Sequence, residues 1–186
     1  KKCSTKMFWV IDGDADLLPE FSLDHKVNEY DLDCVHVWRS RNPINNLIYG
    51  YGGVKLLPRR LTMNVDISST DMTTSISDRF KAMPFVSNIT SFNTDEFSTW
   101  KSAFRECVKL SSKIIQGQED DETNKRLDTW CTTGSEKEFG RFCILGARSG
   151  RDYGNNYKSE PSSLAKINDF DWLQERFHMD EMNDTL

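Results

Sequence analysis

Apolar positions in the first half of the chain alternate with polar ones or form short runs, a pattern typical of β-strands. The run Met7–Ile11 combines aromatic and β-branched residues and ends in Asp-Gly-Asp. It therefore predicts a short strand that is buried on both faces. Residues 32–38 alternate as a half-buried strand does. Further strands are expected over 46–51, 53–57, 61–67 and 85–92.

The pattern changes to a helical one after Asn93. Thr94-Asp95-Glu96 offers a capping residue and early acids, which favour a helix start. The residues that follow place an aromatic stripe on one helix face, formed by Phe97, Trp100, Phe104 and Val108. Further helices are expected over 120–132, 136–147 and 162–178. The simplest architecture is one α/β domain over 1–186, strand-rich over 1–93 and mostly helical over 94–186.

Composition narrows the class of protein. A mean hydropathy of -0.62 and the lack of any apolar run of about 20 residues predict no membrane span. Five scattered cysteines without a CxxC pair predict reduced thiols rather than a disulfide framework, which fits a cytoplasmic location. The net charge of -5 argues against a protein that coats nucleic acid by charge alone.

The charge distribution is more informative than its sum. Residues 38–60 contain no acid, although they include the bases Arg39, Arg41, Lys55, Arg59 and Arg60. Such a local basic stretch predicts a site for an anion such as a phosphate or a nucleotide. The alternative is a chance cluster on a solvated face.

Three carboxylates follow the first predicted strand. Asp12, Asp14 and Asp16 alternate with small residues, so in an extended chain all three would face one cation. Hard oxygen ligands at a strand end suit Mg2+ or Mn2+, which usually also hold substrate phosphates. The alternative is a polar turn whose acids face water.

A glycine-aromatic loop over residues 49–55 is the second candidate for chemistry. Glycines let the backbone approach a ligand closely, and tyrosine rings offer faces on which a sugar or base can stack. The strand before it ends in an aromatic residue and two arginines suited to phosphate. The alternative is an ordinary hairpin turn. The expected substrate-binding residues are Trp38, Arg39, Arg41, Asn42, Tyr49, Tyr51, Gly52, Gly53 and Lys55.

Two enzyme classes place such acids after a strand. Phosphohydrolases of the haloacid dehalogenase type usually have Thr or Val after the second Asp, where this chain has Ala15, and they need a later glycine-aspartate strand end. Sugar-nucleotide glycosyltransferases of the GT-A fold use a DxD whose metal bridges the carboxylates and the donor diphosphate. The GT-A interpretation fits better.

Three motifs together resemble a group of glycosyltransferase-like proteins of tailed phages. They are Phe-Trp-Val-Ile-Asp-Gly-Asp-Ala-Asp, Val-His-Val-Trp-Arg-Ser-Arg-Asn-Pro and Tyr-Gly-Tyr-Gly-Gly-Val-Lys-Leu-Leu-Pro-Arg, and residues 97–112 are similar as well. The resemblance implies a GT-A-like mixed sheet, a nucleotide-sugar donor, Mn2+ or Mg2+, and a modified base of phage DNA as acceptor, contacted through the basic stretch 39–60. A phage origin would place the protein in the host cytoplasm.

One departure from the GT-A pattern is serious. Only eleven residues precede Asp12, whereas GT-A enzymes bind the nucleotide base on a βαβ unit before the DxD. The donor-binding half is therefore expected to be absent from this chain or supplied by another segment. A non-catalytic binding module that retains the fold is the non-enzyme alternative.

The remaining catalytic roles have weaker candidates. An inverting enzyme needs a carboxylate base near the acceptor hydroxyl, and Asp71, which follows the glycine loop, is the leading candidate. Asp95 and Glu106 are rivals, although Asp95 is equally well explained as a helix-start acid. As third metal ligands, His25, His36 and His178 are each better explained as ordinary histidines.

Overall fold

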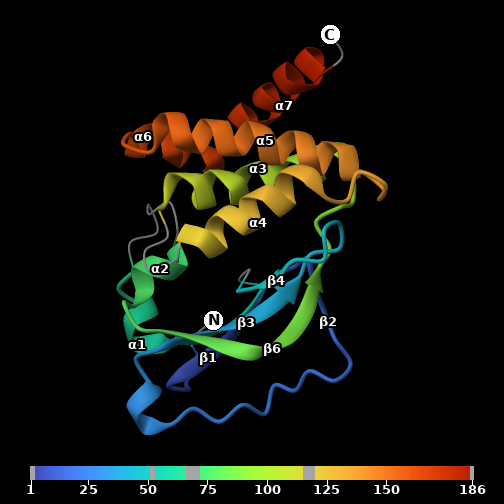
Figure 1. Ribbon diagram of the computed structural model, residues 1–186. Helices are drawn as coiled ribbons and strands as arrows, with labels where there is room; N and C mark the ends of the chain where they lie inside the picture. The colour runs from blue at the N-terminus through green and yellow to red at the C-terminus, as the bar shows by residue number, and fades with distance from the viewer. Residues whose placement is uncertain (1–2, 51–52, 66–71, 115–119, 185–186) are drawn as a thin grey trace. The chain divides into compact units, whose positions relative to one another are not determined.

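A computed structural model describes residues 3–50, 53–65, 72–114 and 120–184 (Figure 1). The chain divides into two compact units, Lys1–Ser91 and Phe92–Leu186, which are described one at a time. The division falls beside the predicted change from strands to helices at residue 93. The single domain over 1–186 stays a prediction.

The strand-rich unit contains a six-stranded mixed sheet, which confirms the expected α/β class (Figure 1). Its strands are β1 (Met7–Ile11), β2 (Ala15–Leu17), β3 (Val35–Arg41), β4 (Ile48–Tyr49), β5 (Val54–Pro58) and β6 (Phe80–Thr90). Their order is β1-β5-β3-β6-β2, with β4 beside β3. Among the described strands, β3 and β6 pair in parallel, and the other pairs are antiparallel. The GT-A likeness of this sheet stays a prediction.

Strand β1 has the predicted bounds, but the prediction that it is buried on both faces is wrong. It lies at an edge of the sheet, antiparallel to β5, and its side chains are half-buried, with Ile11 39% exposed. The apolar run arises because successive side chains join different clusters. Trp9 packs with Trp38 on one face, and Val10 packs with Val35 on the other.

The sheet must curl strongly, because its two edge strands are neighbours in the sequence. Three residues, 12–14, connect β1 to β2. Four Cα–Cα steps from Ile11 to Ala15 reach at most about 15 Å. A flat sheet would hold these edges about 19 Å apart, since four strand spacings of about 4.8 Å separate them. The curl brings the predicted carboxylates next to strands that are distant in sequence.

The face of the sheet on which Val10 packs with Val35 carries two short helices, α1 (Arg59–Thr62) and α2 (Met72–Ile76). The strand predicted over 61–67 is wrong where the structure describes it: residues 61–62 complete α1 and a turn follows. Leu61 and Val65 are four residues apart, and both pack against a cluster that contains Leu57 and Ile76. A helical turn brings two residues at that spacing within about 6 Å of each other on one face, whereas a strand would hold them about 13 Å apart.

The helical unit consists of α3 (Glu96–Ser112), α4 (Asp120–Thr132), α5 (Gly140–Tyr157), α6 (Pro161–Ala165) and α7 (Phe170–Asp184). The described residues also form two 3-10 turns, η1 (Glu29–Asp31) in the strand-rich unit and η2 (Lys166–Asn168) in the helical unit. The predicted aromatic stripe of α3 forms the centre of the helical core, where Trp100 and Phe104 are fully buried. Among the described residues, no helix is long and apolar enough to span a membrane.

Candidate functional site

The three predicted metal ligands lie in and beside the turn that joins β1 to β2, which we call the carboxylate turn (residues 12–16). Its backbone is bonded to residues that directly flank two other strands, β5 and β6. The Asp12 amide donates to the Gly53 carbonyl oxygen at 2.9 Å, and the Ser91 amide donates to the Asp14 carbonyl oxygen at 2.7 Å. The turn is closed by the Ala15 amide, which donates to the Asp12 carbonyl oxygen at 3.1 Å.

The carboxylates do not converge as an extended chain would arrange them. Asp12 forms an ion pair with Lys55, whose Nζ lies 3.0 and 3.1 Å from the two carboxylate oxygens. Asp16 instead accepts a hydrogen bond from the Ser91 hydroxyl. Within the described ranges, no group of three or more His, Cys, Asp or Glu side chains is placed to hold a metal ion. The turn at 12–15 interrupts the alternation on which the prediction depended.

Gly53 and Lys55, in the described part of the glycine loop, lie beside the carboxylate turn. A Cβ added to Gly53 would lie 2.8 Å from the side-chain nitrogen (Nδ2) of Asn88 and 3.1 Å from the Ser40 hydroxyl oxygen. The Ser40 hydroxyl donates to the Asn88 side-chain oxygen at 2.7 Å, and both residues are buried. Gly53 is therefore needed for close packing of three strands. Tyr51 and Gly52 lie outside the described residues.

Several other predicted substrate-binding residues have structural roles. Trp38 and Tyr49 are buried, at 3% and 6% exposure. The Asn42 side chain accepts from the backbone amides of Ile44 and Asn45 at 2.8 and 3.2 Å, which fixes the turn after β3. Arg39 and Arg41 extend from β3 and are exposed. The sequence missed Ser40 and Asn88 because the two are 48 residues apart and carry no local pattern.

The basic stretch is partly neutralised by acids from elsewhere in the chain. Lys55 pairs with Asp12, and Arg60 pairs with Asp33 at 2.9 Å. An acid-free stretch in the sequence is therefore not an acid-free surface. Contact of this stretch with DNA stays a prediction.

The candidate bases fall in different parts of the chain. Asp71 lies outside the described residues. Asp95 and Glu106 belong to the helical unit, where Asp95 caps α3 by accepting from the Ser98 amide at 2.7 Å. This hydrogen bond lowers the pKa of Asp95, which makes its carboxylate a weaker proton acceptor. Its role as a helix-start acid is confirmed.

A segment without strands, residues 18–34, covers one face of the curled sheet; we call it the covering loop. Its Phe21 packs edge-on against Trp9 and Trp38, with ring centroids 6.0 and 5.9 Å apart. His25 lies 5.3 Å from the ring of His36 and 5.2 Å from that of Trp38. Aromatic contacts therefore hold this loop to the sheet.

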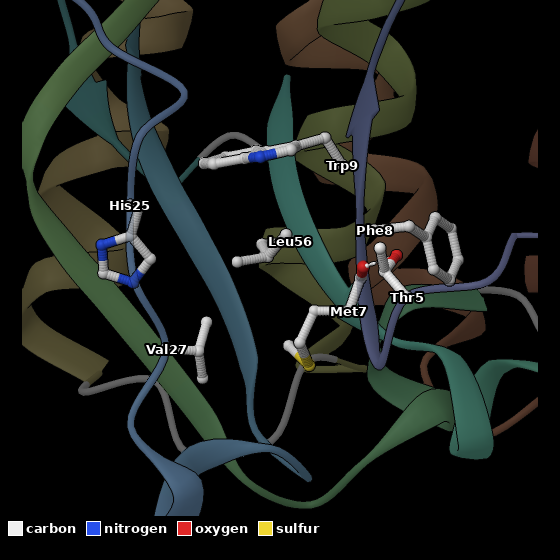
Figure 2. A pocket seen from close by; sticks show the side chains of 7 residues that line it. All are labelled: Thr5, Met7, Phe8, Trp9, His25, Val27 and Leu56. Carbon is white, nitrogen blue, oxygen red and sulfur yellow. Dashed lines mark hydrogen bonds between the residues drawn. The ribbon is translucent and has the colours of Figure 1, made fainter.

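Two hollows flank His25. The Met7 hollow, of about 480 Å³, lies between the covering loop and strands β1 and β5. Figure 2 shows Met7 and Trp9 pointing into it beside Leu56 and Val27, whereas Phe8 points to the other side of β1. The Arg41 hollow, of about 630 Å³, lies between the same loop and strands β3 and β6. Both are within the usual range of small-ligand pockets.

His36 is a buried titratable group at the base of this aromatic cluster. It is 1% exposed, and its Nδ1 has no hydrogen-bond partner. Burial lowers the pKa of His36 below its usual 6.5, and the neighbouring His25 and Lys81 lower it further, against an opposing effect of Asp31. Burial also lowers the pKa of His25. Both imidazoles are therefore neutral at pH 7.

We expect the free energy of unfolding to fall as the pH drops below about 6.5. The unfolded chain binds a proton at His36 from pH 6.5 downward, while the folded chain, whose pKa is lower, does not. Urea unfolding at pH 7.5, 6.5 and 5.5 measures this effect. His36→Leu should show a smaller loss than the parent, whereas replacement of the exposed His178 by Gln should leave the loss unchanged. Equal pH dependence in all three proteins would contradict the prediction.

Comparisons with family models, curated proteins and solved structures gave no match to this chain.

Proposed function

We propose that this protein is a metal-dependent glycosyltransferase that uses a nucleotide-sugar donor. The observation that supports it is the direct connection between the two candidate motifs. Asp12 bonds to the Gly53 backbone and to the Lys55 side chain, so the carboxylate turn lies against the described part of the glycine loop. A diphosphate bound there would lie beside the Asp12 and Asp14 carboxylates, which can hold a cation. It would also lie beside the Lys55 ammonium group and the backbone at Gly53.

The carboxylate turn suits a divalent cation held by fewer than three carboxylates. Asp12 keeps 42% of its side chain exposed despite the ion pair, and Asp14 is exposed. Mg2+ commonly binds one or two carboxylates and completes its shell with waters and substrate phosphates. A bound cation would neutralise the charge that develops on the departing diphosphate. The residues present therefore fit the expected Mg2+ or Mn2+, with Asp12 and Asp14 as its ligands.

Lys55 has two roles in this site. It orients the Asp12 carboxylate, because its Nζ contacts both oxygens and the side chain is only 12% exposed. It also adds a positive charge where donor phosphates would lie, which favours their binding. Lys55 is thus a positioning residue that also competes electrostatically with a cation.

Asp14→Asn is expected to lower Mn2+ affinity at least tenfold, since a neutral amide replaces one of two anionic ligands. The fold should persist, because Asp14 is exposed and its backbone carbonyl, rather than its side chain, bonds to Ser91. Calorimetric titration with Mn2+ alone measures the affinity. Titration with UDP-glucose and a panel of other nucleotide sugars, with and without Mn2+, tests the donor.

Two further variants sharpen the experiment. Asp78→Asn removes an exposed acid of the same unit away from the turn and should change nothing. Lys55→Met should raise Mn2+ affinity several-fold, since a cation next to Asp12 is removed, yet weaken donor binding. Unchanged Mn2+ affinity in Asp14→Asn would show that the motif is a polar turn and would remove the basis of the proposal.

A further inference from the structure

The Arg41 hollow has flat apolar walls, some of which also belong to the core of the sheet. Phe21 faces it from the covering loop and Phe85 from β6, while Trp38 and Met83 also line it. Phe85 is 69% exposed, so its ring is accessible to a ligand. Phe21 is held in place by its contacts with Trp9 and Trp38. Aromatic groups on a loop and on a strand suit a planar ring between them.

Charged groups line the same hollow from two different elements. Glu20 and Asp24 belong to the covering loop, and Arg41 ends β3. The Ser22 hydroxyl donates to Asp24 at 3.1 Å, and the Asp24 amide donates back to it at 3.1 Å, so the loop is locally fixed. The carboxylates accept hydrogen bonds from amino groups, whereas the guanidinium binds anions. A ligand that uses all three carries both an amino edge and an anionic group.

We propose that the Arg41 hollow binds a nucleotide whose base carries an exocyclic amino group. The base would stack beside Phe85 and Phe21 and donate from its amino group to Glu20 and Asp24. The phosphate would bind Arg41. A quaternary ammonium ligand also suits aromatic and acidic groups, but it leaves Arg41 without a role and places two cations in one hollow.

The sheet register connects this hollow with the carboxylate turn. Arg41 of β3 lies opposite Ile89 of β6, which lies opposite Asp16 of β2. Arg41 and Asp16 are thus separated by one intervening strand, which corresponds to about 10 Å across the sheet. The inference nevertheless goes beyond the proposed function, because the hollow would bind such a nucleotide without a cation and without sugar transfer.

Two matched ligand pairs test the amino edge. CMP differs from UMP, and AMP from IMP, by an amino group in place of a carbonyl oxygen on the edge of the base. Calorimetry with the full chain in EDTA should show at least one amino-bearing nucleotide bound about tenfold more tightly than its partner, as expected for a hydrogen bond to a charged group. The double variant E20Q/D24N should lose this preference, because an amide donates as well as accepts.

Two further variants, each with a matched control, test the other contacts. Arg41→Gln should weaken binding of CMP several-fold but leave binding of cytidine unchanged, since only the nucleotide carries a phosphate; Arg39→Gln, two residues earlier on β3, is its control. Phe85→Ala should weaken binding of every nucleotide, and Phe80→Ala on the same strand should not. Phe80 is also exposed, at 44%, but does not line the hollow.

The outcomes separate this inference from the proposed function. The inference would be overturned if none of the four nucleotides bound at 10 mM, because a site with a Kd of about 1 mM, equivalent to about 4 kcal/mol of binding free energy, would be mostly occupied at that concentration. Equal binding within both pairs would overturn it as well. Amino-selective binding in EDTA that E20Q/D24N abolishes would support it even if Asp14→Asn left Mn2+ affinity unchanged.

Discussion

Gly150→Ala is expected to destabilise the helical unit by about 3 kcal/mol, through overpacking between α3 and α5. A Cβ at position 150 would collide with the Phe104 carbonyl oxygen and lie 2.9 Å from the Phe104 Cα. These are backbone atoms of α3, so the neighbouring helix would have to move as a whole. In an isolated helix the same substitution stabilises by about 1 kcal/mol, so the sign of the effect is diagnostic.

Thermal and urea unfolding of the full chain measure this effect. Gly13→Ala is the matched control, because nothing lies within 4 Å of its added Cβ. Gly146→Ala should resemble Gly150→Ala, since its Cβ would lie 3.0 Å from the Trp100 Cα. A Gly150→Ala protein as stable as the Gly13→Ala protein would mean that the two helices do not pack this closely.

The same glycines explain why the sequence predicted α5 only in part. The helix expected over 136–147 runs from Gly140 to Tyr157. Gly146, Gly150 and Gly154 are weak helix formers, and they suggest an end near 147 when only local propensity is considered. Their spacing of four places them on one face, where the absence of Cβ atoms lets α3 approach. Tertiary packing, which single-residue propensity does not include, decides the length of this helix.

The positions of the strands were easier to predict from the sequence than the way in which they pair. The bounds of β1 and the presence of β3, β5 and β6 follow from periodicity and turn residues. The pairing of β1 with β5 and of β2 with β6 does not, because it depends on the curl of the sheet. The short β2 was missed, since its three residues lie within or next to the acidic motif.

The expected helix over 162–178 is divided by η2, and Asp169 starts α7 by accepting from the Asp171 and Trp172 amides.

The candidate site was predictable where motifs carry their own chemistry. Carboxylates after a strand and a glycine loop are visible in the sequence, and the structure does bring Asp12 next to Gly53 and Lys55. What the sequence did not contain is the turn that separates the carboxylates. Nor did it indicate the Arg41 hollow, because Glu20 and Phe85 are 65 positions apart and meet only through the curled sheet.

Asp180→Ala should cost the helical unit about 3 kcal/mol, because it removes the acceptor of a buried indole and the counter-charge of Arg176. Asp180 is 7% exposed and accepts a hydrogen bond from Trp100 Nε1 at 3.1 Å. Its other oxygen lies 3.2 Å from Arg176 Nε, an ion pair without hydrogen-bond geometry. Arg176 also donates to the Ser149 hydroxyl at 3.1 Å, so one carboxylate joins α3, α5 and α7.

Loss of this carboxylate leaves the buried Trp100 Nε1 without its acceptor, which costs about 1–3 kcal/mol, and it leaves the Arg176 guanidinium without its counter-charge. Asp180→Asn should cost less than Asp180→Ala, because its amide oxygen still accepts from Trp100. The control is Asp184→Ala. Asp184 lies on α7, as Asp180 does, and forms an exposed ion pair with Arg141 of α5, so its loss should cost less than about 1 kcal/mol. Urea unfolding of the three variants gives the ranking. Equal stability of Asp180→Ala and Asp184→Ala would show that Asp180 is not the acceptor on which Trp100 and Arg176 depend.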